Sequence, residues 1–477
     1  MYCAGILIKM KSQKINLIKV VVFCSLIINF SPAEAKRKKI VIAKADSAST
    51  ILKKYGIELS QVSIEIRQDG DNLISLNQFE KKIPASVTKI LTSYAVLSRF
   101  PLGSHFLTQV FFDNKDLYLK GGGDPSFVSE NMWYLVNELT RKNLKLIPGD
   151  IVVDDTLFDK IRYDESRESK RVDRAYDSPV GAMSFNWNAV NVFVKPTKVG
   201  QRAQVVVDPE NDFYDVKNNL MTVSGTPKKE LVVSISNTEK SISVSGEVSE
   251  KAGEKAIFKS VIDPEIWSGI NLKAFLKQRG ILVQGKVRAG IVPEQAELLV
   301  SFESKNLSYI MSDMNKFSNN FVAEMLTKNL AVKENKTNVT LKQGVDVIRN
   351  ELNKIGLKEK DFEIENPSGF TRNNKLSAHA LTEVLEAIKN NFSMFPTFLE
   401  SLPIAGIDGT LKKRMRETAA QGFLRAKTGY LNGVVALAGY AGRKDGSILT
   451  FSLLYNGPRD EAIVREAFDQ IVISSVK

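Results

Sequence analysis

The sequence predicts an α+β protein in which strands from both ends of the chain build one antiparallel sheet, flanked by helices. Near the N-terminus, Val62, Ile64 and Ile66 alternate with polar residues ahead of a turn at residues 69–72, a pattern typical of a strand and hairpin. Near the C-terminus, three strand-like runs follow one another before a helical run. A sheet made from both ends implies that the middle of the chain is an insertion.

The C-terminal strands are marked by their turns. "FLRAKTGYL" is followed by Asn432-Gly433, a strong hairpin signal. "VVALAGYA" then has the continuous apolar character of a buried strand, "RKDGS" makes a turn, and "ILTFSLLYN" is the third strand. "DEAIVREAFDQIVISSV" predicts a closing helix. The first of these strands is expected at the edge of the sheet.

The middle of the chain, roughly residues 103–300, has a different texture. Short alternating runs with turns at close intervals predict small β-rich modules; they are "QVFFDNKDLYLKGGGD", "GDIVVDD", "NVFVKP", "AQVVVD", "ELVVSISN" and "SISVSGEV". A helix and a strand are expected in "LKAFLKQRGILVQGKV", and helices return in "MSDMNKFSNNFVAEMLTKNLAV".

The first 35 residues have the features of an export signal. Four lysines at positions 9, 11, 14 and 19 precede an apolar run at residues 20–30, which is too short to span a bilayer. Ala33-Glu34-Ala35 then fits a small-residue cleavage site. We therefore expect a signal peptide cut after Ala35; an uncleaved anchor and a start at Met10 are the alternatives. No apolar or basic amphipathic tail follows the closing helix, so no membrane anchor is expected.

The composition of the chain excludes some kinds of catalytic site and of partner. Cleavage would remove both cysteines, Cys3 and Cys24, which excludes thiol catalysis and cysteine metal sites. It would also lower the formal charge of +12 by three, to +9, because the segment carries four lysines and one glutamate. This balance suits an anionic matrix outside the cell. Nucleic acid is not expected, because residues 36–39 are the single dense basic run and lack interleaved aromatics. The two histidines are not clustered, so we expect no metal or cofactor.

Ser86 and Lys89 form an S-x-x-K pair at the start of an apolar helical run. In one interpretation Ser86 is a helix cap and Lys89 a solvated side chain. In the other, residues three apart share a helix face, so that Lys89 can serve as base for a nucleophilic Ser86, beside free N–H groups that suit an oxyanion. A second match, Ser474 to Lys477, lies at the chain end with no helix to follow.

Two further triplets support the catalytic interpretation of the S-x-x-K pair. Ser318-Asn319-Asn320 leads into an apolar helical run, and Lys427-Thr428-Gly429 stands on the predicted edge strand. Alone, Ser318 could be a helix cap, and Ser-x-Asn recurs at Ser75 and Ser184. In this order, however, the three elements match the S-x-x-K, S-D-N and K-T-G set of penicillin-recognising enzymes, with Asn319 in place of the aspartate.

On these residues the chain resembles the class C low-molecular-mass penicillin-binding proteins, the D-alanyl-D-alanine carboxypeptidase/endopeptidase family. Supporting stretches are "LYLKGGGDPSF", "GDIVVDDTLFD", "LPIAGIDGTLKKRM" and "AKTGYLNGVVALAGYAG". The resemblance implies a transpeptidase-like core with two inserted β-rich domains. We expect a signal peptide at 1–35, a catalytic domain at 36–102 and 301–477, an inserted domain at 103–185 and 264–300, and a second β-rich domain nested at 186–263.

The resemblance also implies roles. Ser86 would attack the carbonyl between two D-alanines and form an acyl-enzyme, with Lys89 as base if burial and the charge of Lys427 keep it neutral. Ser318 would relay a proton to the leaving amine, held by Asn320 and Lys427. Thr428 would bind the terminal carboxylate, and Gly429 and Tyr430 would complete the substrate strand, with the N–H groups of Ser86 and Tyr430 as oxyanion hole. Peptidoglycan stem peptides and β-lactams are the expected partners. Oligomeric state is not predicted.

Two residues are candidates for reading the wall peptide. In the resembling family an aspartate in the insert binds the ammonium of diaminopimelate, and Asp155 in "GDIVVDDTLFD" is the match; a solvated turn is the alternative. Arg372 in "ENPSGFTR", where the family often has "DGSGLSR", is the candidate for its carboxylate. Tyr430 also departs from the serine or threonine that often follows K-T-G. A β-lactamase, a transpeptidase and a non-catalytic wall-binding protein remain open as other functions.

Overall fold

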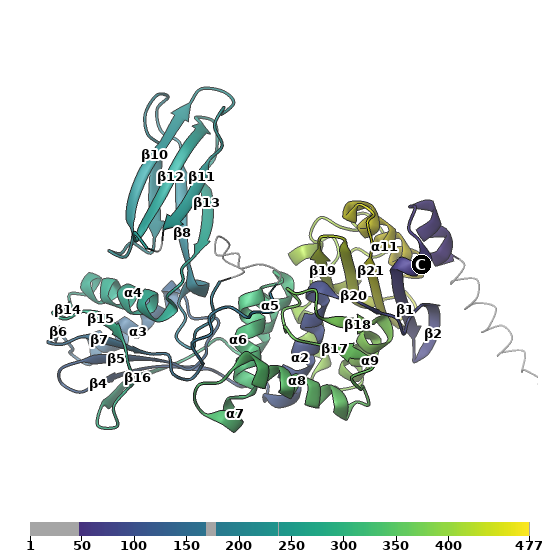
Figure 1. The fold of residues 1–477 in the computed structure, drawn as a ribbon, viewed down its shortest axis with the longest axis horizontal. Helices are drawn as coiled ribbons and strands as arrows, with labels where there is room; N and C mark the ends of the chain where they lie inside the picture. The colour runs from purple at the N-terminus through teal and green to yellow at the C-terminus, as the bar shows by residue number, and fades with distance from the viewer. Residues whose placement is uncertain (1–46, 168–177, 237, 477) are drawn as a thin grey trace, which may run out of the picture. The chain divides into compact units, whose positions relative to one another are not determined.

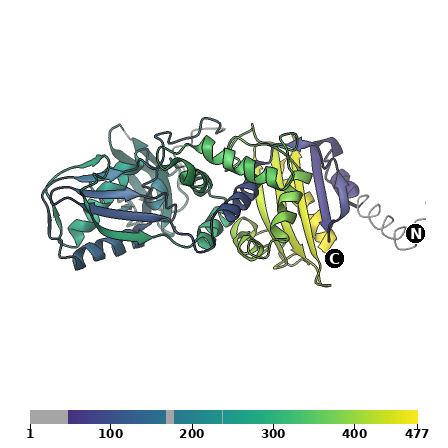
Figure 2. The ribbon, with the colours of Figure 1, turned by 90° about the horizontal axis from the view of Figure 1, so that it is seen from below.

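The computed structural model describes residues 47–167, 178–236 and 238–476. The predicted signal peptide and its cleavage site lie outside the described residues. The central sheet has the strand order β19-β20-β21-β1-β2, and every neighbouring pair in it is antiparallel. Its strands are β1 (Val62–Gln68), β2 (Asp71–Leu76), β19 (Leu424–Leu431), β20 (Val434–Gly442) and β21 (Ile448–Asn456). Strands from the two ends of the chain therefore lie side by side, as the purple and yellow ribbons in Figures 1 and 2 show.

Both faces of this sheet are buried, which explains the continuous apolar run of β20. Ala436, Ala438 and Tyr440 belong to the core formed with α2 (Lys89–Arg99) and α9 (Ala378–Lys389). Val435 and Leu437 point the other way, into the core that contains Phe468 of α11 (Glu461–Val476). Because side chains alternate along a strand, a strand covered on both sides is apolar at nearly every position.

The helices packed on the sheet and on one another around it come mostly from the second half of the chain. They are α2 (Lys89–Arg99), α5 (Leu307–Lys316), α6 (Asn320–Leu330), α7 (Val332–Asn335), α8 (Leu341–Lys354), α9 (Ala378–Lys389), α10 (Phe395–Ser401) and α11 (Glu461–Val476). α9 contacts β1 and β21, and α2 packs against α6, α8 and α9. A small sheet with the order β17-β18-β3 joins β3 (Lys81–Lys82), β17 (Phe362–Glu363) and β18 (Lys375–Ser377).

The chain between α2 and α5 forms its own sheets. The largest has the order β15-β7-β5-β4-β16, made of β4 (Leu107–Phe112), β5 (Leu117–Gly121), β7 (Ile151–Asp154), β15 (Val287–Ala289) and β16 (Glu297–Glu303). Helices α3 (Ser129–Arg141) and α4 (Pro264–Gln278) pack against it, and β6 (Leu146–Ile147) pairs with β14 (Leu282–Val283). Residues 189–260 add two three-stranded sheets: β13-β8-β9 and β10-β12-β11. Their strands are β8 (Ala189–Lys195), β9 (Gln204–Asp208), β10 (Asp215–Val223), β11 (Val232–Ser236), β12 (Ser241–Ser249) and β13 (Lys255–Ser260).

The α+β class and the inserted β-rich middle are confirmed. The sequence did not predict α3, which lies in a stretch expected to be rich in strands. β16 extends across the expected boundary at residue 300, because Ser301 and Phe302 pair with β4. The division into three domains stays a prediction.

Buried polar contacts tie the middle segment to α6. Lys328 donates to Asp159 over 2.6 Å, and the amide of Asn329 donates to the carbonyl of Gly123 over 2.8 Å. Both partners of the salt bridge are largely shielded from water.

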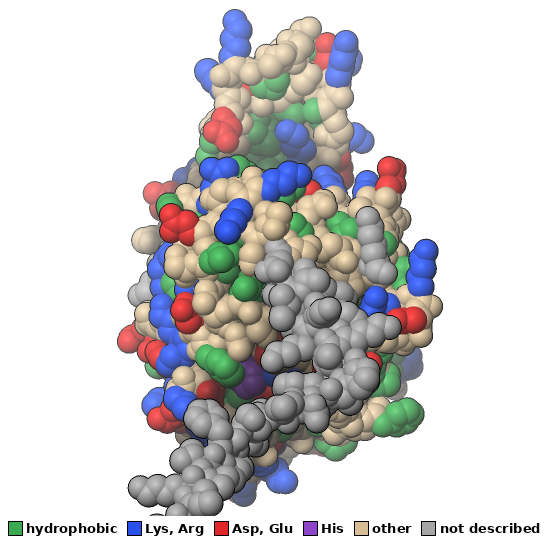
Figure 3. Space-filling view, turned by 90° about the vertical axis from the view of Figure 1, so that its right-hand side faces the viewer, with side chains coloured by type: hydrophobic (Ala, Val, Ile, Leu, Met, Phe, Trp, Pro, Cys, Tyr) green, Lys and Arg blue, Asp and Glu red, His purple; other side chains and the backbone are tan. Residues whose placement is uncertain are grey.

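Two properties bear on partners. No helix in the described part of the chain is long and apolar enough to cross a membrane. On the face shown in Figure 3, lysine and arginine side chains are spread among acidic and uncharged ones and do not gather into one basic patch.

Candidate active site

Ser86 lies in a short 3₁₀ turn, η2 (Ala85–Thr88), that leads directly into α2. Ala85 has a φ of 48°, a left-handed conformation that non-glycine residues adopt at a cost and that clusters at functional sites. Two glycines let other segments press against this turn. A Cβ on Gly369 would meet the Ala85 carbonyl at 2.0 Å, and one on Gly429 would meet the Ser86 nitrogen at 3.2 Å. Ser86 is thus held half-exposed between buried neighbours.

Lys89 is completely buried beneath Ser86. Its Nζ donates to Ser86 Oγ at 3.2 Å, to Asn320 Oδ1 at 2.7 Å and to the carbonyl of Ser368 at 2.6 Å. Both alternatives in which these residues have ordinary roles are wrong. Lys89 is not solvated, and no side chain caps η2 or α2, because the Ser86 hydroxyl faces the Lys89 amine instead.

Ser318 occupies the link between α5 and α6. Its φ of 56° is again left-handed. The helix cap here is Asn319, whose side chain accepts from the Val322 N–H over 3.2 Å, so the alternative of Ser318 as cap is also wrong. This explains how asparagine serves where the motif usually has aspartate, since both residues are good N-caps. Asn320 then begins α6 with its amide oxygen on Lys89.

Lys427, the first residue of the K-T-G triplet, lies next to Ser318. It is fully buried on β19, and its Nζ donates to Ser318 Oγ at 2.8 Å and to the carbonyl of Thr428 at 2.9 Å. Burial and then the positive charge of Lys89 hold the pKa of Lys427 well below its usual range. A charged group taken out of water beside a like charge favours its neutral form, so the doubly charged state of the two lysines is disfavoured.

β19 is an edge strand, as the sequence predicted. Gly429 is buried against the Ser86 turn, whereas Tyr430 is 59% exposed. An edge strand can add an extended peptide as a further strand. The arrangement therefore places a strand-binding edge beside the Ser86 hydroxyl.

A second layer, missed at the sequence level, supports the Ser368 carbonyl. Asn366 Oδ1 accepts from the N–H and the hydroxyl of Ser368, at 2.9 and 2.5 Å. The Asn366 amide nitrogen faces Glu324 Oε1 at 3.2 Å and Asp164 Oδ1 at 3.4 Å. Glu324, on α6, forms a salt bridge of 2.6 Å with Arg167 of the middle segment, and both side chains are at most 2% exposed. The departure at Asn366 from the family's usual aspartate was the one sequence signal of this network.

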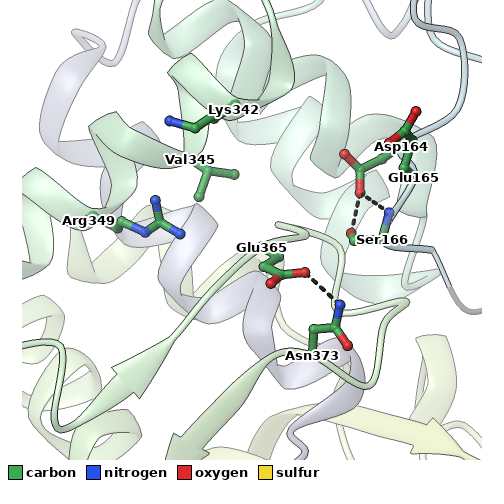
Figure 4. Close-up of a pocket in the computed structure, with 8 residues that line it drawn as sticks. All are labelled: Asp164, Glu165, Ser166, Lys342, Val345, Arg349, Glu365 and Asn373. Carbon is green, nitrogen blue, oxygen red and sulfur yellow. Dashed lines mark hydrogen bonds between the residues drawn. The ribbon is translucent and has the colours of Figure 1, made fainter.

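A cavity of about 540 Å³ opens beside this layer (Figure 4). Its walls come from residues 164–166, from α8 and from the two ends of the 365–373 loop. It is lined by Asp164, Glu165, Ser166, Lys342, Val345, Arg349, Glu365 and Asn373. Ser86, Lys89 and Lys427 are not among its lining residues.

The two predicted peptide-reading residues have other partners in the structure. Asp155 is buried, accepts from Arg162 and from the Met183 N–H, both at 2.6 Å, and has a pKa raised by burial to about 6. Arg372 is exposed and donates to the carbonyl of Asn432 at 2.7 Å. Their roles in substrate binding stay predictions.

Comparison with known proteins agrees with this geometry. Residues 44–475 match the D-Ala-D-Ala carboxypeptidase 3 (S13) family. The chain belongs to this family. It is 30% identical to a D-alanyl-D-alanine carboxypeptidase of Actinomadura sp. over 81% of this chain and 76% of that protein. It is 24% identical to D-alanyl-D-alanine carboxypeptidase DacB of Haemophilus influenzae over 79% and 80%.

Solved structures show the same fold. The crystal structure of penicillin-binding protein 4 from Haemophilus influenzae matches with a TM-score of 0.77 and 22% identity, over 90% of this chain and 99% of that one. A peptidoglycan endopeptidase of Bdellovibrio bacteriovorus matches with a TM-score of 0.50 and 15% identity, over 87% and 92%. The resemblance to the carboxypeptidase family and its transpeptidase-like fold is confirmed. The protein is thus a serine-type D-Ala-D-Ala carboxypeptidase of the penicillin-binding class.

Proposed function

We propose that Ser86 is the nucleophile of this S13 carboxypeptidase and that Lys89 is its base. The observation that carries the proposal is the position of the fully buried Lys89 amine, 3.2 Å from Ser86 Oγ and 2.7 Å from Asn320 Oδ1. A neutral amine has a lone pair for the Ser86 proton. The repulsion between Lys89 and Lys427 favours a state in which one of the two is neutral.

The acylation step follows from these contacts. Ser86 Oγ bonds to the carbonyl carbon of the penultimate D-alanine as its proton passes to Lys89, and the N–H groups of Ser86 and Tyr430 bind the oxyanion. The carbon–nitrogen bond then breaks, and the proton taken by Lys89 returns to the leaving amine through Ser318. Lys427 holds Ser318 for this transfer through their 2.8 Å hydrogen bond.

Deacylation reverses the roles of the same groups. Water replaces the departed amine and gives a proton to Lys89 while its oxygen bonds to the acyl carbon. The bond to Ser86 Oγ breaks as Lys89 returns this proton to Ser86 Oγ, which restores both the hydroxyl and the neutral amine. A penicillin enters the first step through its strained amide and leaves slowly, because its leaving nitrogen stays tethered to the acyl group.

Thr428 and Gly429 are the proposed binding residues for the end of the substrate, along the exposed edge of β19. Asp155 and Arg372 are proposed to read the third residue of the stem peptide. The protein acts outside the cytoplasm, after cleavage near Ala35. The enzyme cleaves terminal D-alanine and, as an endopeptidase, the D-alanyl cross-link.

Product analysis tests this function. Purified protein is incubated with a stem pentapeptide, with a cross-linked dimer and with benzylpenicillin. We expect release of D-alanine, cleavage of the dimer and a long-lived penicilloyl adduct. Rapid multiple turnover of penicillin without peptide cleavage would instead identify a β-lactamase, joining of two peptides would identify a transpeptidase, and no reaction with any of them would identify a wall-binding protein.

A further inference from the structure

The loop before β19 brings a hydroxyl group to the K-T-G triplet. Residues 403–405 pair with the outer edge of β19 through two backbone hydrogen bonds of 3.0 Å, one to the Leu424 carbonyl and one from the Ala426 N–H. The chain then turns into η5 (Gly409–Leu411). There the hydroxyl of Thr428 donates to Thr410 Oγ1 over 2.9 Å, and the Thr410 side chain is exposed.

The loop that carries Thr410 is held against the end of α5, next to the segment that carries Ser318. Asp408 forms a salt bridge of 2.6 Å with Lys316, the last residue of α5, and also accepts from the Ile404 N–H at 2.8 Å. Gly409 has a φ of +53°, and a Cβ there would meet the Lys316 carbonyl at 2.8 Å. A side chain at Gly409 would thus separate the loop from α5. Thr410 therefore has a set place relative to both Ser318 and Thr428.

Tyr430 does not provide this hydroxyl. It lies two residues after Thr428 and so on the same face of the strand, but its ring lies under the guanidinium of Arg465, with 5.8 Å between Cζ and the ring centroid. Its phenol is at the far end of an exposed ring. The hydroxyl that meets Thr428 comes instead from Thr410, across from the strand edge.

We propose that Thr410 and Thr428 together bind the α-carboxylate of the residue that leaves, and that Thr410 makes the enzyme specific for substrates with a free carboxylate there. This rests on the proposed function of Ser86. Two hydroxyls 2.9 Å apart can each donate to one oxygen of a carboxylate. In this pair Thr428 donates to Thr410, so the Thr410 hydroxyl keeps its own proton for a ligand.

The test compares two peptides that differ only at the terminus: an acylated tripeptide ending in D-Ala-D-Ala with a free carboxylate, and the same peptide as carboxamide. Thr410→Val removes the hydroxyl at constant shape, Thr410→Ser keeps it, and Thr226→Val is a matched change at an exposed threonine far along the sequence. We expect Thr410→Val to lower kcat/KM for the acid about tenfold, the effect of one hydrogen bond to a charged group, and to leave the amide unchanged. Thr410→Ser and Thr226→Val should behave as the wild type.

Each other outcome is informative. An unchanged acid-to-amide ratio in Thr410→Val would overturn the assignment. If both rates fall equally, Thr410 only supports the loop; if neither changes, Thr410 has no part in binding. If the wild type cleaves neither peptide, the function proposed for Ser86 fails, and the Thr410 assignment fails with it. The two failures are therefore distinguishable by the activity of the wild type.

Discussion

Changing Asn366 to aspartate should make acylation depend on pH through a carboxyl group in contact with Ser368, the residue whose carbonyl accepts from Lys89. The Asn366 nitrogen lies 3.2 Å from Glu324 Oε1 and 3.4 Å from Asp164 Oδ1. In Asn366→Asp a carboxyl oxygen would take its place. Each contact between two carboxylates at this distance costs about 5 kcal/mol at an effective dielectric constant of about 20, which Arg167, already paired with Glu324, offsets only in part.

The introduced carboxyl group should therefore keep its proton to a pH well above the usual value of about 4. While protonated, it can donate to Glu324 as asparagine does, and its other oxygen still accepts from Ser368. Once ionised, it repels Glu324 and Asp164, and the Ser368 carbonyl loses its support below Lys89. A displacement of about 1 Å at a catalytic group can cost about 100-fold in rate.

The assay is the second-order rate of acylation by a fluorescent penicillin from pH 5 to pH 9, expressed as the ratio of variant to wild type. The ratio removes the pH effects that the two proteins share. We expect a ratio near one at the acid end and a fall toward about one hundredth as pH rises. The free energy of unfolding should also fall as pH rises. Because the folded state raises the pKa of the introduced carboxyl group, the variant should be most stable below about pH 4 and should lose stability as pH rises from there through the raised pKa.

A second substitution is the control. In Asn366→Asp with Glu324→Gln, the total charge of the network is that of the wild type, and the contact with Asp164 is the one carboxylate contact of residue 366 that remains. We expect this double variant to recover part of the rate and to show a weaker pH slope than Asn366→Asp alone. A ratio that is constant with pH in Asn366→Asp, or a slope that is equally steep without Glu324, would refute the reasoning.

Three further predictions concern charge in and near the site. Lys89→Arg should reduce penicillin acylation to background although it keeps the charge, because arginine does not deprotonate in a protein; a near wild-type rate in the labelling assay would show that Lys89 is only structural. Lys427→Met should lower the acylation rate about 100-fold or more yet raise the Tm. The gain in Tm should grow as pH falls from 10 to 7, because the lowered pKa of Lys427 destabilises the folded wild type in that pH range. A Tm below that of the wild type at every pH would contradict this. Asp155→Asn keeps an oxygen for the Met183 N–H. It should lower kcat/KM for diaminopimelate peptides by a factor equivalent to about 1–3 kcal/mol of transition-state stabilisation, without changing the rate of penicillin acylation. An equal fall in both rates would mean that Asp155 stabilises the fold and does not bind the peptide.

The sequence predicted the three C-terminal strands of the central sheet almost to the residue. The reasons are local: Asn432-Gly433 fixes the turn, and burial of both faces makes β20 and β21 apolar at most positions. α3 was not predicted, because it lies among short alternating runs and its apolar face is read only against the sheet that it covers. The 3₁₀ turn at Ser86 was also hidden, since it depends on the close approach of Gly369 and Gly429.

The first layer of the site could be predicted because its residues recur in three short motifs. The second layer could not. Arg167 and Glu324 are 157 positions apart, and nothing near either residue indicates that they meet. Thr410 gave no signal of its own either, because its partner, Thr428, becomes visible only when the loop folds against the strand edge.

Identification of the acylated residue tests the central claim most directly. The full chain and its Ser86→Ala variant are incubated with benzylpenicillin, digested and mapped by mass spectrometry. We expect one penicilloyl group, on the peptide that contains Ser86, and none in the variant, which should stay folded because the lost hydroxyl makes only a 3.2 Å contact with Lys89 and a 3.4 Å contact with Ser368. An adduct that persists in the folded variant, or that maps to Ser318 or Ser474 in the wild type, would contradict the account.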